Sequence, residues 1–252
     1  MPSLDTYREV DVADSSLSIG VIGGTGEHGS GLGLRLAAAG HRVIIGSRSL
    51  DRAAHCADLL AERLPAGALR PAAMTNDAAA AAAEVVLLTL PWDPDGALIA
   101  GLGPALSGKV VVSCANPIGF DARGPHHIDT GHGSAAEHVA TLLPGSQVVG
   151  AFHHLSARSL LDLREDLSAA DVLVCGDDEA AKETIRRLCV AVTGRTGIDA
   201  GPLRLARQIE SFTAVLISVN RRYRTRASVG LRPIADLEPA AGKKPARAAD
   251  AA

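Results

Sequence analysis

A glycine-rich turn between an apolar strand and an apolar helix constrains this chain more than any other feature. Gly24, Gly26 and Gly29 form a G-x-G-x-x-G pattern, with strand signal over residues 19–22 before it and helix signal over residues 32–39 after it. Glycine allows the backbone to turn tightly, and it allows a pyrophosphate to approach the N–H groups at the helix N-terminus. The pattern and its context predict a dinucleotide-binding turn.

The end of the second predicted strand, about 20 residues farther along, indicates which dinucleotide is bound. Chains that bind NAD usually carry Asp or Glu there, because a carboxylate accepts hydrogen bonds from the ribose hydroxyls. This chain has Ser47 and Arg48 instead, with Arg52 one helical turn later. A hydroxyl and two guanidinium groups suit a 2′-phosphate, so we predict NADP(H) rather than NAD(H).

Apolar strands and helices alternate along the chain from Leu17 onward. This alternation predicts an α/β fold with a doubly wound parallel sheet of the Rossmann type. The strands are expected at residues 19–22, 43–45, 85–90, 110–114, 147–152 and 171–175. The helices are expected at residues 32–39, 51–64, 78–83, 179–191 and 203–226.

The two ends of the chain lack the periodicity of its middle. Residues 1–16 are polar, and we expect them to form a flexible leader. Pro, Ala, Gly and charged residues dominate residues 233–252, which predicts a disordered tail.

Composition argues against several classes of function. The net charge is −3 and no face is obviously basic, so no nucleic-acid partner is expected. No apolar run approaches the roughly 20 residues that span a bilayer. The N-terminus lacks a positive region followed by an apolar one, so we expect a cytoplasmic protein. The scattered cysteines are expected to be buried free thiols, and they are Cys56, Cys114, Cys175 and Cys189.

Two further segments follow predicted strands at the carboxyl edge of the sheet, where a doubly wound fold binds its ligand. The first is Leu90-Pro91-Trp92, in which Pro91 fixes the turn. Trp92 either flanks the cofactor or seals a helix against the sheet. The second segment covers residues 153–157, which we expect to lie over the nicotinamide half of the cofactor. The alternative for this segment is an ordinary loop with one exposed imidazole.

Four histidines close together in the sequence, His126, His127, His132 and His138, raise the question of a metal site. Zinc needs three or four converging ligands at recurring spacings. The pairs 127/132 and 132/138 miss the i, i+4 spacing of a helix face, and no cysteine lies nearby. We therefore expect no metal site, and we expect residues 132–134 to form the turn and N-cap of the next helix.

Few acid–base groups accompany these cofactor-binding segments. The chain has no G-x-S-x-G nucleophile motif and no paired carboxylates, and the acidic residues 177–179 suit the first turn of a helix. Hydride transfer between two preformed cofactors requires mainly positioning and a dry site. The scarcity of acid–base residues therefore favours hydride transfer.

Taken together, these segments resemble the NADPH-dependent coenzyme F420 reductases (F420:NADP oxidoreductases), particularly the actinobacterial members. The resemblance covers residues 17–233 and is most specific in His153-His154 and in the terminal helix. The matching segments are residues 23–26 with 31–32, 40–41, 46–48, 88–92, 133–137, 150–154, 175–178, 208–213 and 220–223.

The resemblance implies reversible hydride transfer between NADP(H) and the 5-deazaflavin of coenzyme F420. It also implies a homodimer. The implied organisation is a Rossmann domain over residues 17–152, followed over residues 153–232 by a small C-terminal α/β lobe with a long terminal helix.

The family's binding residues can be carried onto matching positions of this sequence. The resemblance implies that the pyrophosphate of NADP(H) contacts Thr25, Gly26, Glu27 and His28. It implies that the 2′-phosphate contacts Ser47, Arg48 and Arg52. It places Leu90 on the adenine–ribose side and Ala157 near the nicotinamide. It places His153 and Leu155 against the deazaflavin, whose hydrophobic face needs an apolar seat. His153 is the candidate catalytic residue, expected to position the reactants or stabilise charge rather than to act as an essential acid.

Two other functions stay open. An NADPH-dependent reductase of a small imine or carbonyl usually places a lysine or another acid near the nicotinamide. No lysine here stands at the carboxyl end of a predicted strand; they are Lys109, Lys182, Lys243 and Lys244. A non-catalytic NADP(H) sensor would have a damaged nicotinamide pocket, and the intact segment 153–157 argues mildly against it.

Overall fold

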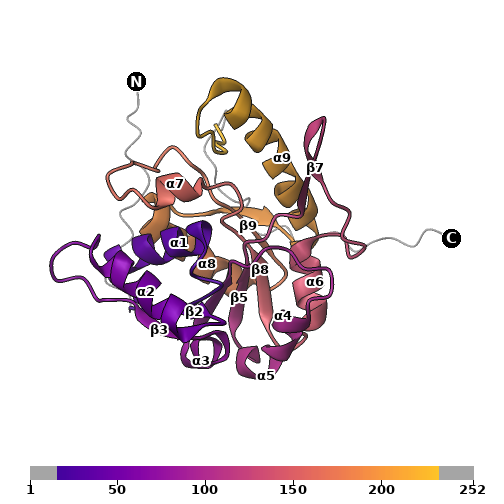
Figure 1. Cartoon of the computed structure of the whole chain (residues 1–252). Helices are drawn as coiled ribbons and strands as arrows, with labels where there is room; N and C mark the ends of the chain where they lie inside the picture. The colour runs from indigo at the N-terminus through magenta and orange to yellow at the C-terminus, as the bar shows by residue number, and fades with distance from the viewer. Residues whose placement is uncertain (1–15, 233–252) are drawn as a thin grey trace.

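The computed structural model describes residues 16–232, and its centre is an eight-stranded sheet in the order β10-β9-β8-β5-β4-β1-β2-β3 (Figure 1). The strands are β1 (Ser18–Ile22), β2 (Arg42–Ser47), β3 (Ala72–Thr75), β4 (Val85–Leu88), β5 (Val110–Ser113), β8 (Gln147–Gly150), β9 (Leu173–Gly176) and β10 (Ile198–Gly201). The predicted leader, apart from Ser16, and the predicted tail lie outside the described residues.

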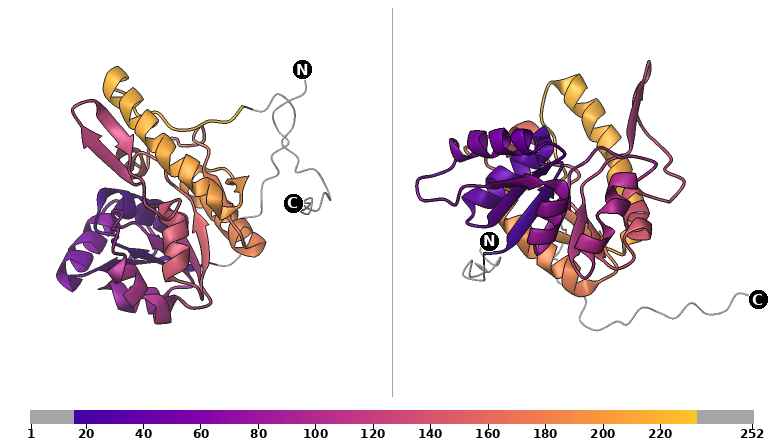
Figure 2. Two further views of the ribbon diagram at one scale, coloured as in Figure 1. Left: turned by 90° about the vertical axis from the view of Figure 1, so that its right-hand side faces the viewer. Right: turned by 60° about the horizontal axis from the view of Figure 1, so that its bottom comes forward.

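Helices cover both faces of this sheet, as a doubly wound fold requires (Figure 2). One face packs against α1 (Glu27–Ala38), α2 (Leu50–Ala61) and α8 (Glu179–Thr193). The other packs against α3 (Asn76–Ala82), α5 (Gly103–Leu106), α6 (Ala135–Leu142) and the first turns of α9 (Ala206–Tyr223), which follows a 3-10 turn over Leu203–Leu205. Two short helices complete the set, α4 (Ala97–Gly101) and α7 (Ala157–Leu160). Within residues 16–232, no helix combines the length and apolarity needed to cross a membrane.

Within the eight-stranded sheet, the strand pairs are parallel with one exception. β8 and β9 run antiparallel, with Gly150 opposite Cys175, so the sheet is mixed rather than wholly parallel as the sequence predicted. A connection between two parallel neighbouring strands usually contains a crossover helix. The connection from β8 to β9 contains only the four-residue helix α7, and the two strands are antiparallel. The next connection contains the 15-residue helix α8, and β9 and β10 are parallel.

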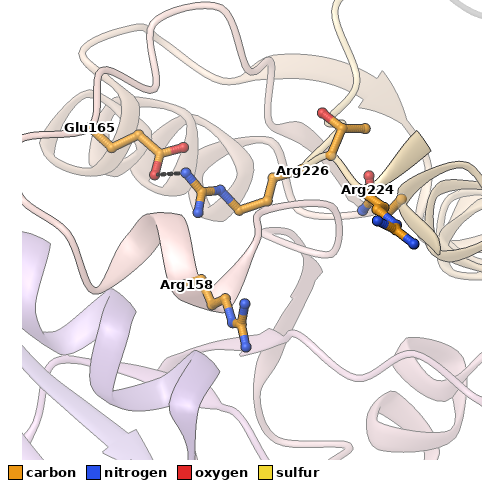
Figure 3. Close-up of a pocket in the computed structure, with 6 residues that line it drawn as sticks. Arg158, Glu165, Arg224 and Arg226 are labelled. Carbon is orange, nitrogen blue, oxygen red and sulfur yellow. Dashed lines mark ion pairs between the residues drawn. The ribbon is translucent and has the colours of Figure 1, made fainter. Parts of the chain in front are cut away.

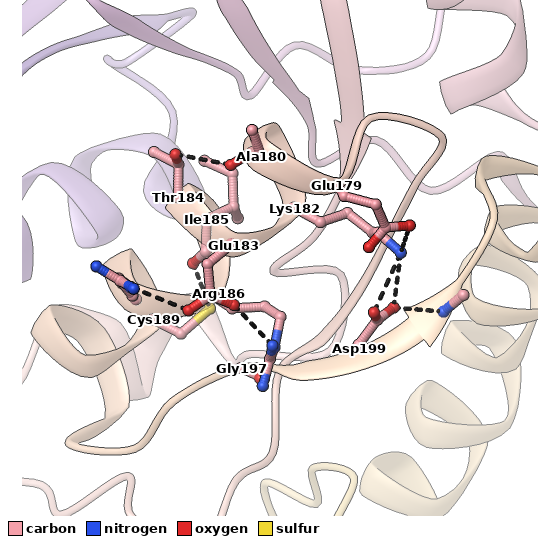
Figure 4. Close-up of polar contacts among 12 residues, drawn as sticks. Glu179, Ala180, Lys182, Glu183, Thr184, Ile185, Arg186, Cys189, Gly197 and Asp199 are labelled. Carbon is pink, nitrogen blue, oxygen red and sulfur yellow. Dashed lines mark hydrogen bonds and ion pairs between the residues drawn. The ribbon is translucent and has the colours of Figure 1, made fainter. Parts of the chain in front are cut away.

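Side-chain contacts fasten the edge strand β10 to α8 (Figure 4). The buried ammonium of Lys182 lies 3.1 Å from an oxygen of Asp199 and 2.9 Å from an oxygen of Glu179. Arg186 Nε donates a hydrogen bond of 2.9 Å to the Gly197 carbonyl. β9 and β10 thus extend the same sheet beyond residue 152, and the division into domains over 17–152 and 153–232 stays a prediction.

A hairpin of β6 (Ile118–Asp121) and β7 (Gly124–His127) projects beside α9 above the sheet (Figures 1 and 2). We call α9 and this hairpin the arm. Asp121 Oδ1 closes the hairpin turn by accepting hydrogen bonds of 2.8 Å from the Arg123 N–H and 3.1 Å from the Gly124 N–H. The Arg221 guanidinium lies 4.7 Å from the centre of the Phe120 ring, which links α9 to the hairpin. Neither hairpin strand was predicted from the sequence, because each has only four residues.

Helix α1 begins at Glu27, five residues earlier than predicted. The prediction missed its first turns because they contain glycines where apolar residues would mark a helix. One of them, Gly31, lies so close to α7 that a Cβ there would be 2.6 Å from the Leu160 Cβ. Glycine therefore permits the close packing of α1 against α7. The edge strands β3 and β10 were also missed, since each has only four residues and neither contains a run of β-branched residues.

The cysteines are free thiols, as predicted. Cys114, Cys175 and Cys189 are buried and Cys56 is half-buried. Burial raises the pKa of the Cys175 thiol to about 12 and raises the pKa values of Cys114 and Cys189 as well. These thiols therefore stay protonated at neutral pH and suit packing rather than nucleophilic chemistry.

Candidate active site

A cleft of about 570 Å³ opens at the carboxyl edge of the sheet, between the loops after β1, β2, β4, β5 and β8 and one face of α9. It is lined by Gly23, Thr25, Gly26, Glu27, His28, Ser47, Arg48, Arg52, Asn76, Thr89, Leu90, Pro91, Trp92, Cys114, Ala115, Asn116, His153, Leu155, Ala157 and Thr213. The structure therefore brings together every predicted site residue except Gly24.

The glycine turn divides its residues between the cleft and the sheet. A Cβ added at Gly26 would meet only the Gly23 carbonyl oxygen, at 3.6 Å, so this side of Gly26 faces open space. Gly24 is buried instead, and its N–H donates to the carbonyls of Val21 at 3.1 Å and Gly46 at 3.0 Å. Gly24 thus ties β1 to β2, while Gly26 leaves room in the cleft.

The N-terminus of α1 presents its backbone to the cleft without a side-chain cap. Its N-cap is Gly26, and no side chain accepts a hydrogen bond from its first turn. Five other helices are capped by a Ser, Thr or Asp side chain, namely α2, α3, α6, α7 and α8. Uncapped N–H groups and the helix dipole attract an anion, so the start of α1 fits a pyrophosphate.

The end of β2 supplies positive charge to the same cleft. Ser47 is buried, whereas Arg48 and Arg52 are exposed on the loop and on the first turn of α2. This donor set suits a phosphate monoester, which accepts hydrogen bonds from hydroxyl and guanidinium groups. Asn76 lies between the two loops and accepts a hydrogen bond of 3.4 Å from the Gly23 N–H. Asn76 lines the cleft and was not among the site residues predicted from the sequence.

An unusual backbone conformation precedes the histidine pair. Phe152 is buried and has a φ of +64°, in the left-handed region that few non-glycine residues occupy. After this turn, His153 lines the cleft and His154 packs beneath α9. The His154 Nε2 lies 2.7 Å from the Ile209 carbonyl oxygen, and its ring meets the Phe212 ring edge-on at 5.8 Å. The two adjacent histidines therefore differ in their surroundings, and only His153 lines the cleft.

Several buried polar atoms around the cleft lack hydrogen-bond partners among the described residues. They are Nε2 of His28, Nε1 of Trp92, Oγ of Ser113 and both ring nitrogens of His153. Buried polar groups are normally paired, so such a concentration indicates a place where a polar ligand completes the bonding. Trp92 lines the cleft, and its contact with a cofactor stays a prediction.

Burial also sets the protonation state of these histidines. Burial, together with the neighbouring His154 and His28, lowers the pKa of His153 to about 3. It lowers the pKa of His28 to about 4. Both imidazoles are therefore neutral near pH 7, with one donor and one acceptor nitrogen each. A neutral ring can donate a hydrogen bond but is poorly suited to supply a proton.

Asn116 connects the two walls of the cleft and was not predicted from the sequence as a site residue. Its Nδ2 donates a hydrogen bond of 3.0 Å to the His153 carbonyl, and its Oδ1 accepts one of 3.0 Å from the Thr213 hydroxyl. Thr213 belongs to α9, so this single amide joins the loop after β5, the His153 loop and the arm. No local pattern signals such a contact, because its partners lie 37 and 97 residues away.

The histidine cluster does not assemble a metal centre. His132 and His138 stack with ring centres 4.0 Å apart. As predicted, Ser134 caps α6, accepting a hydrogen bond of 3.0 Å from the Glu137 N–H. Within residues 16–232, no three His, Cys, Asp or Glu side chains lie close enough to hold a metal ion.

Comparison with known proteins agrees with this geometry. The family profile described as NADP oxidoreductase, coenzyme F420-dependent, matches residues 18–117. The chain is 38% identical over 220 residues to the F420-dependent NADP reductase of Methanothermobacter marburgensis, covering 86% of this chain and 97% of that one. It is 35% identical over 226 residues to the F420-dependent NADP reductase of Methanocaldococcus jannaschii, covering 88% of this chain and 100% of that one.

A solved structure from Arthrobacter sp. FB24, provisionally described as an F420-dependent NADP reductase, has a similar fold. Its TM-score is 0.72 at 26% identity, and the match covers 86% of this chain and 100% of that one. The family profile spans β1 to β5 with the glycine turn, and the curated relatives match over nearly their whole length. The chain belongs to the family of coenzyme F420-dependent NADP oxidoreductases.

Proposed function

We propose that this chain catalyses reversible hydride transfer between NADP(H) and the 5-deazaflavin of coenzyme F420. The observation that carries the proposal is a single cleft that joins an uncapped helix N-terminus, a basic strand end and a buried neutral histidine. Family membership supports the same pair of reactants.

The NADP(H) half of the cleft lies between β1 and β2. The backbone of Thr25, Gly26, Glu27 and His28 would hold the pyrophosphate, and Ser47, Arg48 and Arg52 would hold the 2′-phosphate. Leu90 and Pro91 would lie against the adenine–ribose side. The open space beside Gly26 and the donor set at the end of β2 support this orientation.

The deazaflavin half would lie between Trp92, Leu155 and the His153 ring, with Ala157 near the nicotinamide. When both are bound, the two rings exchange a hydride directly, with no protein group as carrier. His153 and Leu155 are at least nine-tenths buried, so the loop excludes water from the transfer. The donor nitrogen of neutral His153 would stabilise the negative charge that develops on the reduced pyrimidine ring.

The test of this function is single-turnover mixing of NADPH with F420, followed by the deazaflavin absorbance. We expect the wild type to bleach F420 and His153→Ala to do so tens of fold more slowly. A tenfold change corresponds to about 1.4 kcal/mol, in the range of one electrostatic contact rather than of an essential acid. Because the pKa of His153 lies near 3, no ionisation of this ring should affect the rate between about pH 5 and pH 9.

The controls separate the competing functions. NADPH binding to His153→Ala should be nearly unchanged in an equilibrium titration, which shows that the cleft is intact. Complete loss of transfer with normal binding of both reactants would instead make His153 an essential catalyst. A wild type that binds NADPH but reduces only an imine or carbonyl, or reduces nothing, would favour the alternative reductase or the sensor.

The cofactor preference makes a second prediction. Arg48→Ala removes one charged hydrogen-bond donor to the 2′-phosphate, worth on the order of 1.5–3 kcal/mol. We therefore expect NADPH affinity to fall roughly tenfold or more, with NADH affinity almost unchanged. Arg63→Ala, an exposed arginine outside the cleft, is the matched control in the same titration. Equal losses of affinity for NADPH and NADH would show that Arg48 does not bind the 2′-phosphate.

We also propose a homodimer that works in the cytoplasm. Exposed apolar side chains on the arm support an interface between copies: Phe120, Phe212, Val215 and Tyr223. The free, buried thiols support a reducing compartment.

A further inference from the structure

A second cavity, of about 660 Å³, lies beyond the carboxyl end of α9 and outside the active-site cleft (Figure 3). It is lined by Arg158, Glu165, Asn220, Arg224, Thr225 and Arg226. We call it the arginine cavity. The lining contains three guanidinium groups and one carboxylate, so its net charge is positive.

The single carboxylate is already engaged. One oxygen of Glu165 lies 2.9 Å from Arg226 Nη2, and the other accepts a hydrogen bond of 2.8 Å from the Ser159 hydroxyl. Arg158 and Arg224 form no ion pair or side-chain hydrogen bond with any residue between 16 and 232. Two positive charges on different walls of the cavity are therefore left to bind an anion.

The walls of this cavity are held by the fold. The segment after α9 is fixed by Asn220, whose Oδ1 accepts a hydrogen bond of 2.6 Å from the Ala227 N–H, and by Asp171, whose Oδ2 accepts one of 2.7 Å from the Leu231 N–H. On the opposite side, Arg35 of α1 donates to the carbonyls of Ser159, at 2.8 Å, and Glu165, at 2.9 Å. Arg158 and Arg224 thus project from anchored backbone.

Arg224 adopts a conformation that usually selects glycine. It is the C-cap of α9 and has a φ of +51°, in the left-handed region. A cation there also interacts favourably with the helix dipole, which is the purely structural explanation. Arg221 and Arg222 already occupy the last turn of α9, so the dipole does not require a third arginine.

The arginine cavity lies close to the active-site cleft. Arg158 follows Ala157, which lines the cleft. Thr213 of the cleft and Asn220 of the cavity are seven residues apart on α9, which places them on one helix face about 10 Å apart. A reactant held in the cleft would reach the cavity with an extension of this length.

We propose that the arginine cavity binds the anionic side chain of the deazaflavin reactant. This inference rests on the proposed function. Coenzyme F420 carries a phosphate ester and carboxylates on the ribityl chain of its deazaflavin, and guanidinium groups recognise both kinds of anion. The ring would then be held by the cleft and the side chain by Arg158 and Arg224.

The test compares F420 with the ribityl deazaflavin that lacks the phosphate and carboxylates. Fluorescence titrations would measure the binding of each to the wild type, Arg158→Gln, Arg224→Gln and the double variant. We expect F420 affinity to fall roughly tenfold for each arginine, with the shorter deazaflavin affected less than about twofold. Arg207→Gln, an exposed arginine at the other end of α9, should change neither affinity.

Each other outcome has a distinct meaning. Equal effects on both deazaflavins, or no effect on either, would overturn the inference while leaving the proposed function in place. A wild type that neither binds nor reduces either deazaflavin would overturn both. Inorganic phosphate should compete with F420 in the wild type and lose this effect in the double variant. Phosphate binding at the arginines without any competition would mean that the cavity holds only free anions.

A final variant separates binding from helix stabilisation. Arg224→Gly removes the guanidinium and relieves the left-handed backbone, so the unfolding midpoint should stay unchanged or rise while F420 affinity falls as in Arg224→Gln. A lower midpoint with unchanged F420 affinity would assign Arg224 to the helix terminus and overturn its part in the cavity.

Discussion

Gly26→Val is expected to reduce NADPH affinity more than about 100-fold, a loss of roughly 2.7 kcal/mol or more. Gly26 has an extended backbone, with a φ of −77° and a ψ of 158°, which valine adopts readily. A Cβ there would approach the described protein atoms no closer than 3.6 Å. The added side chain would therefore occupy the space beside the uncapped N-terminus of α1 and exclude the pyrophosphate.

The control for this prediction is Gly101→Val. Gly101 also has open space at its Cβ position, and it lies in α4 away from the cleft. Both variants should keep the circular dichroism of the wild type, and only Gly26→Val should lose NADPH in an equilibrium titration. Tight binding of NADPH to Gly26→Val would place the cofactor elsewhere.

The second large effect concerns Glu210, which fastens α9 to α6. This fully buried carboxylate accepts hydrogen bonds of 2.8 Å from the Ala135 N–H and 3.0 Å from the Ala136 N–H, at the start of α6. Burial raises the pKa of Glu210 to about 7, although the two N–H groups oppose the rise. The side chain is therefore an anchor for the arm whose charge changes near neutral pH.

The sign of its effect on stability follows from the raised pKa. The folded state binds the proton more tightly than the unfolded state, so this residue costs stability as pH rises from about 4.5 to about 7. At about 1.4 kcal/mol for each tenfold change, the full cost is about 3 kcal/mol. The free energy of unfolding should be measured with urea between pH 4.5 and pH 8. In the wild type we expect it to fall with rising pH by this additional amount, and in Glu210→Gln we expect this part of the fall to be absent.

The comparison needs an exposed carboxyl as its reference. Glu62→Gln, at the end of α2, should follow the wild type at every pH. The free energies of unfolding of the wild type and Glu210→Gln could instead differ by the same amount at every pH. That result would mean that the two N–H hydrogen bonds and the helix dipole fully offset the effect of burial on the pKa of Glu210. Buried His28 and His153 act in the opposite sense, since their lowered pKa values cost stability as pH falls below about 6.5.

The parts of the fold that could be predicted are those encoded by neighbouring residues. The glycine turn, the apolar strands β1, β2, β4, β5 and β8, and the Ser134 cap of α6 each depend on a short stretch of sequence. Gly26, Arg48 and His153 follow such strands, and parallel strands bring their carboxyl ends to one edge. Their common location therefore followed from local patterns, while their roles stay predictions.

The parts that were missed depend on distant contacts. Asn116 lies in the site because of hydrogen bonds to His153 and Thr213, and neither partner is near it in sequence. The antiparallel direction of β9 depends on the path of the chain between strands, which periodicity does not describe. The β6–β7 hairpin lacks a strong strand pattern, and it contacts α9 through Phe120 and Arg221, which are distant in sequence.

The unbroken strand ladder from β10 to β3 has a consequence for folding cooperativity. β8 precedes residue 152 and β9 follows it, so neither half of the chain can unfold without breaking strand pairs of the other. Ligand bound at the carboxyl edge is therefore coupled to the unfolding of the whole sheet. Occupancy of the cleft by either reactant would add its binding free energy to the stability of all eight strands together.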